Sequence, residues 1–230
     1  MTDLIVPALS GLAAGLVHVL SGPDHLAAVA PLAVESRDSH WRPGLNWGIG
    51  HTGGVLVVGL LALLFRELLP VDLLSSWGER MVGVVLIGIG LWGARRAAGL
   101  TIHVHEHTHD GARHAHVHAH GAKVPHPPAA PHPHPHVHTR AAFAVGVLHG
   151  LAGSSHLLGV LPALAFSTRS ESVTYLAAFG VATIAAMTGF AGLMGLFAER
   201  ARAGGARLYR NILYACSAAA IVVGCVWLVV

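Results

Sequence analysis

Apolar residues run along this chain in six long stretches, separated by short patches of charged residues and glycine. The stretches lie near residues 4–34, 44–65, 80–98, 141–166, 172–198 and 208–230. At a rise of about 1.5 Å per residue, each is long enough to cross about 30 Å of hydrocarbon as a helix. The pattern therefore predicts an all-α, polytopic membrane protein with about six transmembrane helices.

The first stretch contains a signal that interrupts a helix. Ser21, Gly22 and Pro23 stand in its middle, and proline removes a helical hydrogen bond and clashes with the preceding turn. The stretch is also longer than one crossing needs. It is either one broken, tilted helix or a helix followed by a re-entrant piece, and both interpretations place a break at these three residues.

Composition and charge support a membrane location and give an orientation. Apolar residues make up 53% of the chain and charged residues 11%. In a six-span arrangement, eleven of the 14 Lys and Arg residues fall on one side and three on the other. The positive-inside rule then places both termini outside a bacterial inner membrane and the loop between spans three and four in the cytoplasm. The net charge of +3 follows from this asymmetry and does not indicate nucleic-acid binding.

The two halves of the chain resemble each other. Eight identities at a constant offset of 131 residues relate one segment of each half. The segments are HVLSGPDHLAAVAPLAVES at 18–36 and HGLAGSSHLLGVLPALAFS at 149–167. A weaker echo aligns WGIGH at 47–51 with FGVAT at 179–183, where the histidine is lost. Halves with an odd number of spans sit in opposite orientations, so we expect inverted three-helix repeats at 1–100 and 140–230 and transport by alternating access.

Candidate chemistry concentrates at His18, Asp24 and His25. Asp24 is the one acidic residue of eleven that lies deep within an apolar stretch, where a carboxylate is costly unless a cation or strong donors compensate it. His18 and His25 are seven residues apart, which is about 10 Å along a continuous helix. One ion can reach both only if the helix breaks between them. The sequence therefore predicts a metal site at the break.

Further ligands are expected from the next span and from the second half. His51 lies in the glycine-rich segment 48–54, where small residues allow close helix approach, and we predict it as a fourth ligand. In the second half, His149 and His156 repeat the seven-residue spacing without the acid. They form either a second metal site or gate, or polar contacts across the repeat interface.

The segment between these two histidines corresponds to the break in the first half. Gly153 is the equivalent break position, and Ser154 and Ser155 replace the proline and the acid. We include both serines in the candidate second site.

The ligand types restrict the metal. Imidazole and carboxylate suit nickel, cobalt, zinc, copper(II) and iron(II), and the lack of a Cys or Met cluster argues against copper(I). The chain holds only two cysteines, nine residues apart in the last span.

The motifs His18…Asp24-His25 and Gly50-His51-Thr52 resemble the paired signatures of the nickel/cobalt transporter family, called NiCoT or NicO. Five residues separate His18 from Asp24, where the best-known permeases have four. Within this family the chain is most similar to the urease-accessory, UreH-type branch. The similarity lies in this spacing, in the sequence GPDH at 22–25 and in HGLAGSSH at 149–156. The resemblance implies Ni²⁺ or Co²⁺ as the transported ion, with Zn²⁺ as an alternative. It leaves the direction open, because relatives include uptake permeases and efflux proteins. We expect uptake, with efflux as the alternative, and a cytoplasmic nickel chaperone or metalloenzyme assembly system as partner.

The loop at 101–139 carries 13 of the 19 histidines. It is of low complexity, and we predict that it is unstructured without metal and buffers metal in the cytoplasm. Its histidines are His103, His105, His107, His109, His114, His116, His118, His120, His126, His132, His134, His136 and His138.

Other classes of protein explain less. The chain has no HExxH pair, no HxxHH box and no second intramembrane acid to act as a general base, so we expect no catalytic residues and no catalytic cofactor. A membrane sensor or storage protein would account for the His-rich loop but not for Asp24 or the repeat. The metal ion and the lipid bilayer are the expected partners, nucleic acid is not, and no oligomeric state is predicted.

Overall fold

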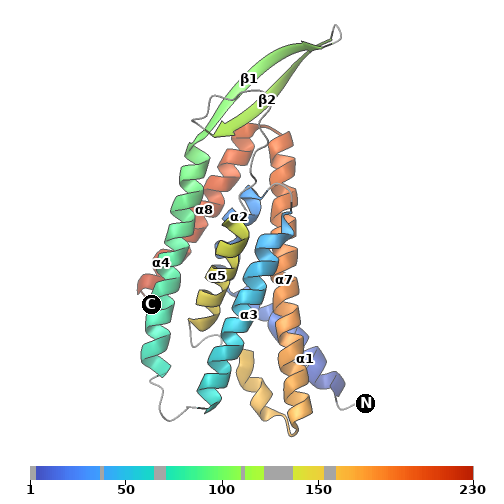
Figure 1. Ribbon diagram of the computed structural model, residues 1–230, viewed down its shortest axis with the longest axis vertical. Coiled ribbons are helices and arrows are strands. Elements are labelled where there is room, and N and C mark those ends of the chain that lie inside the picture. Colours follow the sequence, from blue (N-terminus) through green and yellow to red (C-terminus); the bar gives the residue numbers. More distant parts are fainter. Residues whose placement is uncertain are drawn as a thin grey trace.

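The computed structural model describes the whole chain except residues 1–3, 37–38, 65–70, 110–111, 122–136, 153–158 and 230. Seven α-helices and a short 3-10 helix, η2, make up the body of the described part (Figure 1). They are α1 (Ile5–Ser21), α2 (Pro23–Glu35), α3 (Trp41–Leu64), α4 (Val71–Ala98), α5 (Val137–Leu151), η2 (Leu161–Ala165), α7 (Arg169–Ala203) and α8 (Ala206–Val229).

The predicted break in the first apolar stretch is present. Helix α1 ends at Ser21, Gly22 adopts an extended conformation, and Pro23 begins α2 at an angle of 73° to α1. Proline suits this first helical position because its missing N–H would have no helical partner there. Helix α2 is short and almost entirely buried, and it packs against α3, α4, α5, α7 and α8.

Fewer helices than six meet the length and hydropathy expected of a membrane span. In the described part, residues 77–98, α7 and α8 are each long and apolar enough, and the bent pair of α1 and α2 adds a fourth. Helix α3 covers the second predicted stretch, and α5 begins the fourth. The chain is a multi-pass helical membrane protein, and the count of six remains a prediction.

Glycine brings the most extensively packed helices close together. These helix pairs are α3 with α5, α4 with α8, and α1 with α7. Gly50 and Gly54 on α3 face the backbone of α5, and Gly146 and Gly150 on α5 face the backbone of α3. A side chain at any of these positions would meet the neighbouring backbone, as is typical of small-residue contacts between membrane helices.

The His-rich loop contains a β-hairpin, so the prediction that it is unstructured was wrong for the described part. Strand β1 (Leu100–His109) pairs antiparallel with β2 (Ala112–Gly121) at one end of the bundle (Figure 1). The cause is visible in the sequence, because His alternates with other residues, several of them Ile, Val or Thr, in the period of two that favours strands. The all-α prediction therefore holds for the bundle but not for this loop.

The loop histidines divide between three places. The strands carry His103, His105, His107, His109, His114, His116, His118 and His120. Within the hairpin His103 pairs with His118, His105 with His116, and His107 with His114. His138 lies in α5, whereas His126, His132, His134 and His136 lie outside the described residues.

Candidate metal centre

Three imidazoles from three helices meet at the break between α1 and α2. His18 lies in the last turn of α1, His25 in the first turn of α2, and His51 within α3. The Nε2 atom of His18 lies 3.1 Å from Nε2 of His51 and 3.2 Å from Nε2 of His25. His25 and His51 are buried and His18 is partly exposed. We call these three residues the triad.

The geometry of the triad fits one shared cation. Ligand nitrogens about 2.0–2.1 Å from one ion lie about 3.0–3.4 Å from each other, and both Nε2 separations fall in that range. Each Nε2 has either one proton or one lone pair. A cation between the three rings would accept one lone pair from each Nε2.

Asp24 lies behind His25, away from His18 and His51. Its Oδ1 accepts from Nδ1 of His25 at 2.9 Å, and its Oδ2 accepts from Nε2 of His149 at 2.9 Å. A carboxylate that accepts from Nδ1–H fixes the ring and directs the Nε2 lone pair toward a metal. The four predicted ligands are thus divided: the three histidines face one another, and Asp24 orients His25.

Local structure explains how a buried carboxylate is tolerated here. Asp24 is the only buried acid among the described residues, and it lies in the first turn of α2. Backbone N–H groups at a helix N-terminus carry a partial positive charge that stabilises an anion. Together with the two imidazole donors, they replace the solvation that the carboxylate loses.

Of the second-half candidates, only His149 lies among the described residues. Gly153, Ser154, Ser155 and His156 lie outside the described residues. His149 is buried near the end of α5 and belongs to a group of close ligand atoms with Asp24 and His25. Its contact with Asp24 also crosses from one half of the chain to the other, so both predicted roles remain open for it.

Two aromatic residues that were not predicted as site residues pack against the triad. The ring of Trp47 on α3 stacks on His51, with centroids 4.7 Å apart, and the ring of Phe179 on α7 lies 5.5 Å from His18. Both side chains are buried. The signal was present in the sequence, because these are the two aromatic residues that the weak repeat aligns.

Two buried hydroxyls lie next to this cluster. Thr52 follows His51 on α3 and packs against Gly180 of α7, and Thr183 lies one turn beyond that glycine. Neither hydroxyl has a hydrogen-bond partner among the described residues. These two hydroxyls are potential hydrogen-bond donors and acceptors beside the cluster.

Gly22 is required by the site. A Cβ at this position would lie 2.2 Å from Nδ1 of His25 and 2.9 Å from Oδ1 of Asp24. The φ and ψ of Gly22 are −92° and 96°, which alanine also adopts, so the backbone is not the constraint. The carboxylate–imidazole contact itself excludes a side chain.

Gly22→Ala is therefore expected to weaken metal binding about 10–100-fold, the usual effect of disturbing a group that orients a ligand. Metal titration of the purified chain, with its thirteen loop histidines changed to asparagine so that only the buried sites bind, measures this change. Gly88→Ala is the control, because Gly88 is exposed on α4 and nothing lies near its Cβ position. Equal affinities for the two variants would show that the contact between His25 and Asp24 does not position the triad.

Comparisons with known proteins give a family and three relatives. A family model described as "Cytochrome C biogenesis protein transmembrane region" matches residues 9–226. Two Arabidopsis thaliana chloroplast proteins, FOR GROWTH AND FERTILITY 2 and 1, are 31% and 34% identical over 97% and 96% of the chain. The chain spans 56% and 58% of their lengths.

The urease accessory protein UreH of Bacillus sp. (strain TB-90) is 29% identical over 84% of this chain and 78% of its own length. This relative agrees with the branch that the motifs resemble, whereas the matching family model has a different description from the nickel/cobalt family. No solved structure matches the chain.

Proposed function

We propose that this chain, which belongs to the family of the cytochrome c biogenesis protein transmembrane region, carries a divalent transition metal ion across a membrane. The observation that carries the proposal is the triad, in which three imidazole nitrogens from three helices converge at a helix break. Interrupted helices that expose backbone ends to a cation are a recurrent feature of secondary transporters.

Thiol chemistry is a poor alternative for this chain, although the family description names cytochrome c biogenesis. Cys216 and Cys225 lie on the same helix, α8, about 13.5 Å apart along its axis. A disulfide needs Cα atoms less than about 7 Å apart. The chain has no other cysteine, so it cannot form an internal disulfide without unfolding α8.

Helix packing supports an inverted repeat and alternating access. Exchanging the halves replaces α1 by α5, α3 by α7 and α4 by α8. This exchange turns the α1–α7 pair into the α5–α3 pair and the α4–α8 pair into itself, and these are the most extensively packed pairs. We therefore propose six spans in two inverted repeats, with both termini outside and the hairpin in the cytoplasm.

Nickel is the proposed first substrate, followed by cobalt, with zinc as an alternative. A set of imidazoles accepts all three ions. The motif resemblance and the UreH relative, named for its accessory role to urease, favour nickel. Uptake is the proposed direction, with efflux as the alternative, and a cytoplasmic nickel chaperone or metalloenzyme assembly system would receive the ion.

The hairpin supports metal handling at the cytoplasmic end. Residues directly opposite in an antiparallel pair are neighbours on one face, so three cross-strand His pairs and two further His positions share a face of the ribbon. This register places histidine positions of the two strands opposite one another, and we propose that the hairpin is a metal buffer beside the transport path.

The test is metal flux in cells that express the wild-type chain, His51→Ala or His40→Ala. His40 is the control because it is a largely buried histidine paired with Glu199, outside the triad. We expect accumulation of nickel or cobalt that His51→Ala lowers to the empty-vector level and His40→Ala leaves unchanged. Depletion of metal that depends on His51 would reverse the direction to efflux. Flux that is independent of His51 would refute the proposal.

A further inference from the structure

We propose that Asp24, His25 and His149 form a second, inner position for the ion, and that the ion passes to it from the triad across the ring of His25. This inference rests on the proposed transport function. It assigns His149 a direct role as metal ligand. The described residues hold two groups that could bind a metal, and His25 belongs to both.

His25 presents opposite ring nitrogens to the two groups. Its Nε2 lies 3.2 Å from Nε2 of His18, and its Nδ1 lies 2.9 Å from Oδ1 of Asp24. The other oxygen of Asp24 lies 2.9 Å from Nε2 of His149. One ligand atom from each of Asp24, His25 and His149 lies within 4.8 Å of the others. Small movements of these side chains would close them around an ion.

Burial gives the two positions an order. His18 is partly exposed and lies between exposed residues of α1, such as Val17 and Leu20. Asp24, His25 and His149 are all at least 97% buried. The second position is therefore the more enclosed of the two, and the triad is the one nearer to the surface of the bundle.

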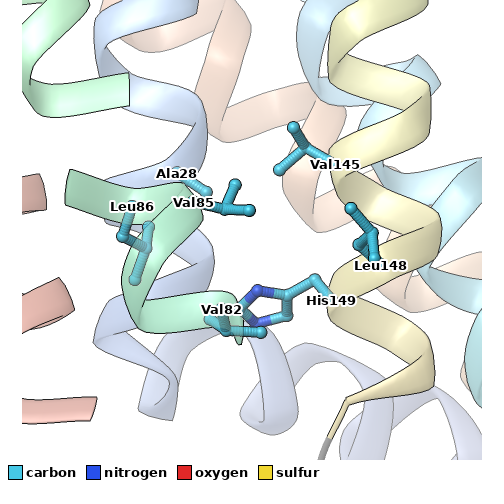
Figure 2. Close-up of a pocket in the computed structure, with 7 residues that line it drawn as sticks. All are labelled: Ala28, Val82, Val85, Leu86, Val145, Leu148 and His149. Carbon is cyan, nitrogen blue, oxygen red and sulfur yellow. The ribbon is translucent and has the colours of Figure 1, made fainter. Parts of the chain in front are cut away.

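A pocket lies on the far side of the second position. Figure 2 shows the His149 ring pointing from α5 toward Val82 of α4, where it is the only polar group among the residues lining the pocket. The other lining residues are Ala28, Val82, Val85, Leu86, Val145 and Leu148. The pocket has room for about one water molecule. This space gives the His149 ring room to shift when an ion binds beside it.

The ion keeps its oxidation state during the transfer, and the protons of the two rings are conserved. In the triad the ion is bound by Nε2 of His25, while Nδ1–H is donated to Asp24. At the second position Nδ1 of His25 and Nε2 of His149 bind the ion, and water carries their protons to the opposite nitrogens. Each ring keeps one proton. Repulsion between two divalent ions on one imidazole in a low-dielectric interior restricts the pair of positions to one ion at a time.

The inference is tested with the full-length chain in which the thirteen loop histidines are changed to asparagine, so that only the buried sites bind. Ni²⁺ is the probe for binding in detergent and for flux into liposomes that contain a metal-sensitive dye. Two variants are compared, with His40→Ala as control. His149→Ala removes the imidazole, and His149→Gln removes it but keeps a donor for Asp24.

We expect both His149 variants to bind Ni²⁺ within about threefold of the parent affinity, because the triad is intact, and to lose at least tenfold in flux. His40→Ala should match the parent in both measurements. Full flux in either His149 variant would overturn the inference, and so would parallel loss of affinity, since His149 would then only support Asp24. Absence of flux in the parent chain would instead refute the proposed transport function.

Discussion

Asp24→Asn is expected to reduce metal transport to the level of cells without the protein. In the structure both Asp24 oxygens accept from an imidazole, one from His25 and one from His149. Asparagine has one acceptor oxygen, so its NH₂ group would face an N–H donor and the negative charge would be lost. Loss of a group that orients a metal ligand typically lowers affinity 10–100-fold. Ni²⁺ uptake by cells measures the loss of transport, and Ni²⁺ titration of the chain without its loop histidines measures the loss of affinity.

Glu199→Gln is the matched control for that experiment. Glu199 also holds an imidazole, with Nε2 of His40 2.6 Å from Oε1, but its side chain is 51% exposed near the end of α7. Water replaces a lost contact there, so transport should stay within about twofold of wild type. Equal losses in both variants would mean that any carboxylate–imidazole contact in the bundle supports folding, and would remove the special role of Asp24.

Gly150→Ala is expected to abolish transport and to destabilise the bundle by about 1–3 kcal/mol, the usual cost of overpacking. A Cβ on Gly150 would lie 2.2 Å from the carbonyl oxygen of His51, so α5 and α3 would have to separate. That separation moves His149 away from Asp24 and displaces His51 in the triad. Thermal unfolding in detergent and Ni²⁺ flux provide the two measurements.

Gly53→Ala separates this packing effect from helix propensity. Gly53 lies on α3, three residues from Gly50 and next to Gly54, but it is exposed and nothing lies near its Cβ position. Alanine favours a helix over glycine, so this variant should be as stable as wild type or slightly more stable. If Gly150→Ala behaved in the same way, the close α3–α5 approach would be unimportant for the site.

The centre of the site was predictable because one short segment contains both the buried charge that costs energy and the residues that interrupt the helix. An acid and two histidines in an apolar stretch, with Gly22-Pro23 between them, need a break and a compensating charge, and the structure has the break where the sequence indicates it. His51 was predicted from a glycine-rich segment and does join His18.

The partition between ligands and supporting groups was not predictable. Whether Asp24 faces the ion or the back of His25 depends on the 73° bend and on the depth of α5 in the bundle. Both are set by packing between distant segments, which one sequence does not specify. The same holds for Trp47, whose stacking on His51 has no local signal beyond the weak repeat.

The hairpin was missed for a different reason. The low complexity of the loop, rich in His and Pro, predicts disorder, and its histidines were interpreted only as a metal buffer. Alternation also suits a strand, because every second residue can then share one face.

Helix α2 is anchored at the end opposite the metal centre. Glu35 accepts from Arg96 of α4 at 2.9 Å and from the Tyr209 hydroxyl of α8 at 3.0 Å. Arg202 of α7 donates to Tyr209 and to the backbone carbonyl of Val34. Three neighbouring helices thus hold the C-terminal end of α2.

Because the C-terminal end of α2 is held in this way, any tilt of α2 would be largest at its other end, where His25 lies. His25 lies ten residues from Glu35, a distance of about 15 Å along the helix. A tilt of α2 by about 10° around Glu35 would displace His25 by about 2.6 Å, whereas residues beside Glu35 would hardly move. The contact between His25 and His18 is 3.2 Å long, so a small rotation at one surface of the bundle is enough to open or close it.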